Sequence, residues 1–203
     1  MIQKEARLEV IAGTMFGGKS SELIRRIKRH EILGRKVHVF GPSIDTRYGK
    51  NSITSHDLLQ REASYVSSVR ELEEKLSSAV QVIGIDEVQF FESSIIETCE
   101  RYAGRGKIVI AAGLLKDFRD EYFPFRDGNK TMSDLLKTAD ITTILTAICD
   151  AQNEAGEICG NDASRVQRFI DSHVAPYDSP VVQVGGKESY APRCRKHYQF
   201  YRQ

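Results

Sequence analysis

The sequence contains no tryptophan and only five prolines among its 203 residues. It also lacks a large excess of either charge, because it has 29 lysines and arginines and 28 aspartates and glutamates. A dedicated nucleic-acid binder usually carries a basic excess, so this balance argues against that class. No apolar run reaches the roughly 18 residues of a membrane-spanning helix, and the first residues lack the apolar segment of a signal peptide. We therefore expect a cytoplasmic protein with no membrane or nucleic-acid partner.

Cysteine is also scarce, with four residues in the whole chain. In a cytoplasmic protein, metal ligation or burial is a more common role for cysteine than a disulfide. Cys99 lies on the apolar side of an expected helix and is interpreted as a core residue. The other three, Cys149, Cys159 and Cys194, lie in the last third of the chain and are candidates for metal ligation.

Apolar segments of two kinds alternate along the first 148 residues. Runs rich in valine and isoleucine predict buried strands at 7–13, 36–40, 80–87, 107–114 and 141–149. Helices are expected at 20–33, 69–76, 93–104 and 132–139, and long loops at 41–62 and 116–130. Strands that alternate with helices indicate an α/β fold, with a mostly parallel sheet flanked by helices.

The composition changes at Cys149. From there long apolar runs stop, and glycine, proline, aspartate and serine become frequent. A segment of this size and composition buries little core by itself, so it needs a cross-link. We therefore expect two domains, an α/β nucleotide-binding domain at 1–148 and a small metal-stapled domain at 149–203.

The segment "GTMFGGKS" has the spacing of a phosphate-binding loop, and it lies between an expected strand and an expected helix, as that motif requires. Backbone N–H groups at the helix start can bind an anion, and Gly17 and Gly18 allow a close approach. Lys19 would reach the β and γ phosphates, and Ser20 would bind Mg²⁺. The predicted phosphate and Mg²⁺ site comprises Gly13, Thr14, Met15, Phe16, Gly17, Gly18, Lys19, Ser20 and Ser21.

Two carboxylates, Asp86 and Glu87, follow the apolar run "VIGI". In open α/β sheets, ligands bind at the carboxyl ends of strands. Asp86 is therefore expected to bind Mg²⁺ directly or through water, and Glu87 to act as a general base. A solvated acidic turn is the alternative. If the base activates water the protein is an ATPase or GTPase, and if it activates a substrate hydroxyl it is a kinase.

Cys194 and His197 have the pair spacing of zinc ligands. Cys149 and Cys159 are separated by nine residues, which is wider than the usual two to four. Spacing alone therefore leaves two interpretations open. One is a zinc site with four ligands, and the other is two buried cysteines with an unrelated surface pair.

Taken together, these residues resemble the type II thymidine kinases, the zinc-containing class, from Glu9 to Tyr198. "GTMFGGKSSELIRR" is similar to the phosphate loop of that family, and "DEVQFF" to a motif whose glutamate is the base. The resemblance implies a P-loop, RecA-like fold whose small zinc-stapled lasso domain covers the nucleoside. It also implies that the γ-phosphate of ATP passes to the 5′-hydroxyl of thymidine, with Mg²⁺ and a structural Zn²⁺ as cofactors.

The resemblance extends to individual residues. It implies that Arg47 of "DTRY" lies near the phosphates and acts in catalysis with Lys19 and Glu87, and that Asp86 shares the ATP and Mg²⁺ site. The implied zinc ligands are Cys149, Cys159, Cys194 and His197. The implied nucleoside-binding residues are Met15, Asp45, Glu87, Gln89, Phe90, Leu114, Phe118, Val166, Val181, Gln183, Val184, Gly185 and Tyr190. A homotetramer and feedback inhibition by thymidine triphosphate are further implications.

Three features depart from the family pattern. The first zinc pair is usually C-x-x-C, whereas here about seven residues are inserted between Cys149 and Cys159. Val166 replaces a threonine, and Leu115 replaces an aspartate that is frequent in the family. The alternative function is a zinc-bearing P-loop ATPase or GTPase that acts on nucleic acid, favoured only by the basic run "RRIKRH". A catalytically inactive nucleotide sensor conflicts with the presence of Lys19, Ser20, Asp86 and Glu87.

Overall fold

The computed structural model describes residues 6–43, 52–54, 60–183, 185–186 and 188–199. Its centre is a six-stranded sheet in the order β5-β2-β6-β7-β1-β8, in which each neighbouring pair is parallel. The strands are β1 (Arg7–Gly13), β2 (Val37–Pro42), β5 (Ser64–Val66), β6 (Val82–Ile85), β7 (Ile108–Leu114) and β8 (Ile141–Leu145). The predicted α/β fold with a mostly parallel sheet is confirmed.

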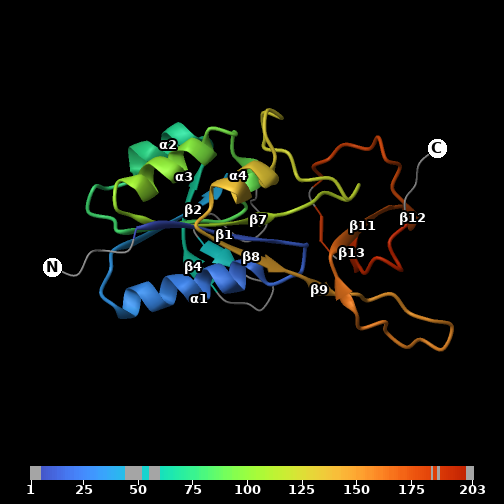
Figure 1. Cartoon of the computed structure of the whole chain (residues 1–203). Coiled ribbons are helices and arrows are strands. Elements are labelled where there is room, and N and C mark those ends of the chain that lie inside the picture. The colour runs from blue at the N-terminus through green and yellow to red at the C-terminus, as the bar shows by residue number, and fades with distance from the viewer. Residues whose placement is uncertain (1–5, 44–51, 55–59, 184, 187, 200–203) are drawn as a thin grey trace.

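Helices cover both faces of the sheet (Figure 1). Helix α1 (Lys19–Ile32) lies on one face, and its apolar residues Leu23, Ile24 and Ile27 are buried there. The opposite face is covered by α2 (Val69–Lys75), α3 (Ile95–Gly104) and α4 (Met132–Thr138). Parallel strands covered on both faces need apolar residues on both sides, which explains the continuous apolar runs in the sequence.

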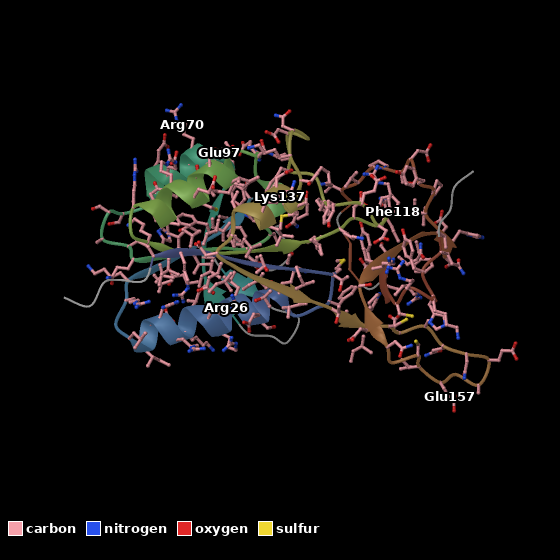
Figure 2. All side chains as sticks on the ribbon, in the orientation of Figure 1. Arg26, Arg70, Glu97, Phe118, Lys137 and Glu157 are labelled. Atoms are coloured by element: carbon pink, nitrogen blue, oxygen red, sulfur yellow. The ribbon has the colours of Figure 1, made fainter. Side chains whose placement is uncertain are left out.

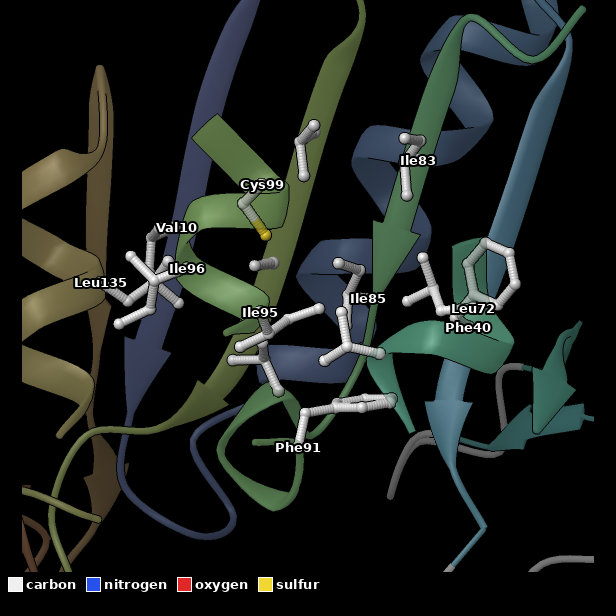
Figure 3. Packing of buried hydrophobic residues seen from close by; sticks show 14 of the residues in the cluster. Val10, Phe40, Leu72, Ile83, Ile85, Phe91, Ile95, Ile96, Cys99 and Leu135 are labelled. Carbon is white, nitrogen blue, oxygen red and sulfur yellow. The ribbon is translucent and has the colours of Figure 1, made fainter. Parts of the chain in front are cut away.

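The core has two layers, one on each face of the sheet. Along β1, Leu8 and Val10 pack into the cluster beneath α2, α3 and α4, whereas Ile11 packs into the cluster beneath α1. This division follows from the period of two residues along a strand. Figure 3 shows part of the larger cluster, in which Phe91 and Ile95 lie close to the end of β6.

The predicted loop at 41–62 was wrong in part. Strand β2 continues through Pro42, and β3 (Ser52–Thr54) pairs antiparallel with β4 (Gln60–Glu62). Strands of three residues are too short to show a period in the sequence, which explains the difference. The expected strand at 141–149 is also divided, because β8 ends at Leu145 and β9 (Ala147–Ile148) leaves the sheet to pair with β10 (Asp162–Ala163).

The C-terminal region also contains a three-stranded antiparallel sheet, in which β11 (Arg165–Ile170) lies between β12 (His173–Val174) and β13 (Tyr190–Arg193). The inserted residues between Cys149 and Cys159 form a hairpin that projects from the body of the protein, with Glu157 near its tip (Figures 1 and 2). Across the described part of the chain, the helices are too short or too polar to cross a membrane.

Candidate active site and metal site

The chain between β1 and α1 forms a tight loop. The Thr14 backbone N–H donates to the carbonyl of Leu145 at 3.2 Å, and the Gly17 N–H donates to the carbonyl of Thr14 at 3.2 Å. A Cβ atom on Gly13 would lie 2.2 Å from the Leu145 oxygen, so only glycine fits there. Gly18 has a left-handed backbone, with φ of 77°, immediately before the first helical residue. The loop therefore brings backbone N–H groups to the start of α1, where an anion can bind.

Lys19 is the first residue of α1, and its side chain folds back over the loop. Its ammonium group donates to the Thr14 carbonyl at 2.8 Å, and the residue is only 8% exposed. Burial lowers the pKa of Lys19, while the carboxylates of Glu87 and Asp86 act in the opposite direction. The cation thus lies within the field of both carboxylates and beside the phosphate loop.

Ser20 and Asp86 meet across the end of the sheet, since the Ser20 hydroxyl donates to the Asp86 carboxylate at 2.9 Å. Burial and the neighbouring Glu87 raise the pKa of Asp86 to about 7. A hydroxyl and a carboxylate are oxygen ligands of the kind that Mg²⁺ binds, and a divalent cation would favour the ionised carboxylate. These two residues therefore fit a magnesium site, and the Mg²⁺ role that the sequence assigns to them stays a prediction.

Glu87 follows directly, with a left-handed backbone (φ 47°) that precedes the short 3₁₀ helix η1 (Val88–Phe90). Its carboxylate accepts a hydrogen bond of 2.6 Å from the side-chain amide of Gln89. The amide oxygen of Gln89 accepts from the Leu114 N–H at 3.0 Å, and Gln89 is fully buried. The structure thus places the Gln89 side chain between Glu87 and β7. The contact with the nucleoside that the resemblance implies stays a prediction.

A small apolar cluster lies between the phosphate loop and the C-terminal strands. Its buried members are Phe118, Val166, Ala175 and Tyr190, and Met15 packs against them. Four of the residues predicted to bind the nucleoside therefore come together here. Figure 2 shows Phe118 on the side of the C-terminal strands.

Other predicted nucleoside-binding residues lie elsewhere. Phe90, Leu114 and Val181 pack against the large core cluster. The carbonyl of Gln183 accepts the Tyr190 hydroxyl at 2.9 Å, and Gly185 is buried close to Ser189. Asp45, Arg47 and Val184 lie outside the described residues, so their roles stay predictions.

Two arginines of β11, which the sequence motifs did not single out, hold the C-terminal region together. The Arg168 guanidinium donates to the Pro180 carbonyl at 2.6 Å and lies 5.2 Å from the centre of the Phe118 ring. Arg165 pairs with Asp120 at 3.0 Å. Together they join β11 to the loop after β7 and to the segment before β13. Charged residues are rarely buried without a partner. The two arginines in the otherwise strand-like segment "RVQRF" could therefore have indicated buried ion pairs or hydrogen bonds.

The three cysteines and His197 form one compact cluster, because their ligand atoms all lie within 4.8 Å of one another. The Cys159 and Cys194 sulfurs are 3.9 Å apart, which is far longer than a disulfide bond of about 2.05 Å. His197 Nδ1 lies 3.6 Å from the Cys149 sulfur and 3.5 Å from the Cys194 sulfur. A zinc tetrahedron with Zn–S of about 2.3 Å and Zn–N of about 2.0 Å has edges of about 3.8 Å and 3.5 Å. The four residues therefore fit a tetrahedral metal ion.

The surroundings of Cys194 also suit a metal. Burial opposes ionisation of its thiol, but the backbone N–H groups of His197 and Lys196 help to lower its pKa overall. This favours the thiolate that a metal requires. The inserted hairpin does not separate the ligands, since the Cys159 N–H donates to the Ala151 carbonyl at 2.8 Å and the Gly160 N–H donates to the Cys149 carbonyl at 3.1 Å.

Comparison with known proteins identifies the family. A family profile described as "Thymidine kinase" matches residues 6–198. The chain belongs to the thymidine kinase family. A curated thymidine kinase from Thermococcus kodakarensis is 42% identical to it over 196 residues, which is 94% of this chain and 93% of that protein. The family predicted from the motifs is confirmed, and membership favours a kinase over the alternative ATPase or GTPase.

Two departures from the thymidine kinase pattern can now be located. Val166 lies in the apolar cluster with Phe118 and Tyr190. The hydroxyl that the threonine of the family pattern would place in this cluster is therefore absent. Leu115 packs against the large core, and its backbone N–H donates to the carbonyl of Gly13 at 3.0 Å. Nothing in the structure explains why leucine replaces the frequent aspartate.

Proposed function

We propose that this chain transfers the γ-phosphoryl group of ATP to the 5′-hydroxyl of thymidine, giving thymidine monophosphate and ADP. Family membership supports the reaction. The observation that carries it is the meeting, at the carboxyl ends of β1 and β6, of the phosphate loop, the Ser20–Asp86 pair and Glu87. The chain would then have two domains, in which residues 1–148 bind the nucleotide and residues 149–203 form the lasso domain over the nucleoside.

The phosphates of ATP lie on the backbone of residues 13–21. Lys19 and Arg47 stabilise the charge on the transferring phosphoryl group. Ser20 and Asp86 would hold Mg²⁺, which would supply positive charge to neutralise the phosphates. This chain's own residues thus supply positioning and charge, which is most of what phosphoryl transfer requires.

Glu87 accepts the proton of the 5′-hydroxyl as its oxygen attacks phosphorus. A carboxylate suits this role because it can approach a hydroxyl within hydrogen-bond distance and take its proton. The Gln89 amide donates to one carboxylate oxygen and keeps it oriented. The other oxygen is then the one that faces the substrate.

The thymine base occupies the apolar cluster of Met15, Phe118, Val166 and Tyr190, and backbone groups of the lasso segment at 176–189 pair with its polar edge. A site built to pair with a thymine edge leaves buried groups unpaired against cytosine, at a cost of about 1–3 kcal/mol each. The remaining predicted contacts are Asp45, Glu87, Gln89, Phe90, Leu114, Val181, Gln183, Val184 and Gly185.

Cys149, Cys159, Cys194 and His197 hold one structural Zn²⁺. The geometry of their ligand atoms supports this assignment. Because protein ligands fill all four positions, none is left for a reactive water, and the ion would stabilise the lasso domain rather than take part in the chemistry.

We further propose a cytoplasmic homotetramer that thymidine triphosphate inhibits. A molecule with both thymine and a triphosphate matches the nucleoside and phosphate sites together. Among the described residues, no strand pairs with the outer edge of β8. Ile141 and Ile144 of that strand are 42% and 52% exposed, which suits a contact between copies of the chain.

A panel of nucleosides with Mg²⁺ and ATP tests the function, scored by the monophosphate formed. Thymidine and deoxyuridine should react, whereas deoxycytidine and the purine deoxynucleosides should not. Comparable turnover of deoxycytidine would contradict the pocket. ATP hydrolysis that needs nucleic acid and yields no nucleoside monophosphate would support the alternative function. Lys19→Ala, which loses the phosphate contact, is the inactive control.

A further inference from the structure

The side chain of Thr14 has a role that phosphate binding does not require. Its hydroxyl donates to the Ala163 carbonyl at 3.0 Å and accepts from the Ala147 N–H at 3.1 Å, and the residue is 6% exposed. Ala147 and Ala163 face each other as partners in the β9–β10 pair. The hydroxyl of a phosphate-loop residue therefore closes the end of a strand pair that belongs to the metal-binding region.

The backbone of Thr14 has its own partners within the phosphate loop. Its carbonyl accepts from the Gly17 N–H at 3.2 Å and from the Lys19 ammonium at 2.8 Å. These two bonds close the phosphate loop and hold its cation. One residue thus joins the cation of the phosphate loop to the β9–β10 pair.

The strand pair leads directly to the metal ligands. Cys149 follows β9, and its N–H donates to the Asn161 carbonyl at 2.8 Å, just before β10. Ala147 and Ala163 pack in the same buried cluster as Cys149 and Cys194. Phe16 of the phosphate loop packs against that cluster and also against the apolar nucleoside cluster. Packing and hydrogen bonds therefore follow the same route.

We propose that Thr14 is a positioning residue that couples the metal site to the phosphate loop. Metal binding by the four ligands fixes the positions of β9 and β10. The Thr14 hydroxyl, which is bonded to both strands, then fixes the Thr14 carbonyl that accepts the hydrogen bond from Lys19. Metal binding and nucleotide binding then strengthen each other, because coupling between two sites is reciprocal. The inference rests on the proposed function, in which the loop binds the phosphates of ATP and the ligands bind zinc.

A cycle of three proteins and two metal states tests the coupling. The affinity of the β,γ-imido analogue of ATP with Mg²⁺ is measured by calorimetry for wild type, Thr14→Ser and Thr14→Val, each loaded with zinc and stripped of it. Thr14→Ser keeps the hydroxyl and is the matched control. Zinc removal should weaken binding by about fivefold or more in wild type and Thr14→Ser. In Thr14→Val, binding should already be weak with zinc present and should change little on its removal.

A reciprocal measurement uses only the zinc-loaded proteins, in case the stripped forms do not stay folded. The rate of zinc transfer to a chelator is followed with and without the analogue. The analogue should slow transfer in wild type and Thr14→Ser but not in Thr14→Val. Equal slowing in Thr14→Val, or nucleotide affinity independent of zinc in wild type, overturns the inference. If wild-type protein phosphorylates thymidine but its two sites show no coupling, the proposed function is supported and only the coupling is refuted.

Discussion

At the scale of single residues, the site depends on a carboxylate held in an unusual backbone conformation. A non-glycine residue with positive φ, such as Glu87 at 47°, costs on the order of 1–3 kcal/mol and persists only where its surroundings hold it. Here the Glu87 N–H donates to the Asp86 carboxylate at 3.0 Å, and Gln89 holds the Glu87 side chain. Backbone and side chain of the proposed base are thus both fixed before a substrate arrives.

Replacing Glu87 tests its role as the base. Glu87→Gln keeps the size of the side chain but removes the proton acceptor, so turnover should fall by roughly two to four orders of magnitude. The affinity for thymidine, measured by calorimetry, should stay close to that of wild type. Glu97→Gln is the control, since Glu97 is an exposed carboxylate of α3 that pairs with Lys130. Near-normal turnover in Glu87→Gln would show that another group takes the proton.

Gln89→Met separates the role predicted from the sequence from the one that the structure indicates. Methionine fills a similar volume but neither donates to Glu87 nor accepts from Leu114, so kcat should fall by roughly 10²-fold, as for a small misplacement of a reacting group. The KM for thymidine should change much less. Steady-state kinetics measures both values. A raised KM with unchanged kcat would instead mean that Gln89 binds the nucleoside.

At the scale of elements, the metal cluster depends on strand pairing more than on sequence spacing. The bond from the Cys149 N–H to the Asn161 carbonyl and the return bond from the Gly160 N–H keep the two ends of the hairpin together. The inserted residues extend outward from that point (Figure 1). Lengthening such a loop costs little, about 0.6 kcal/mol for each doubling. The unusual spacing is therefore compatible with a normal ligand set.

Serine substitutions test two of the four ligands. Cys149→Ser and Cys159→Ser should each lower the zinc content well below one ion per chain and reduce the thermal midpoint, because a structural zinc site contributes to folding. Cys99→Ser is the control for zinc content, because Cys99 is a buried residue of α3 and is not one of the four clustered ligands (Figure 3). Metal analysis and thermal unfolding measure the two effects. Full zinc content in Cys149→Ser alone would mean that another group supplies the fourth ligand.

At the scale of the whole molecule, residues next to a strand end could be predicted and residues with distant partners could not. The acidic pair Asp86–Glu87 directly follows an apolar run, and Lys19 and Ser20 begin the helix that follows another. Their place at the edge of the sheet therefore followed from the order of elements. The hydroxyl partner of Thr14 lies 149 residues away in the chain, and no local pattern reveals it.

The same limit applied to parts of the fold. The alternation of strands and helices predicted the central sheet, because parallel strands buried on both faces have an apolar signature. The tail has short strands, and its antiparallel pairs join residues such as Arg168 and Tyr190 that lie far apart in the sequence. Its cohesion depends on buried arginines and a ligand cluster, which composition alone does not show.

Assembly can be tested at the edge of the central sheet. Ile144→Lys places a charge on the outer strand β8, where lysine opposes pairing between edges. We expect the proposed homotetramer to shift to smaller species, measured by light scattering after size-exclusion chromatography. Ile158→Lys is the control, because Ile158 is an exposed isoleucine on the projecting hairpin. An unchanged mass in Ile144→Lys would place the contact between copies elsewhere.

The order of the strands also determines when each strand can pair during synthesis of the chain. Strand β1 leaves the ribosome first, yet its two neighbours in the sheet are β7 and β8, and the latter begins at Ile141. At ordinary rates of translation this delay is on the order of ten seconds. The phosphate loop can form all its hydrogen bonds only later, because its partners include Leu145 and Ala163. A chain that ends before Ala163 therefore lacks a partner of the phosphate loop, and we expect ATP to stabilise only chains that extend beyond that residue.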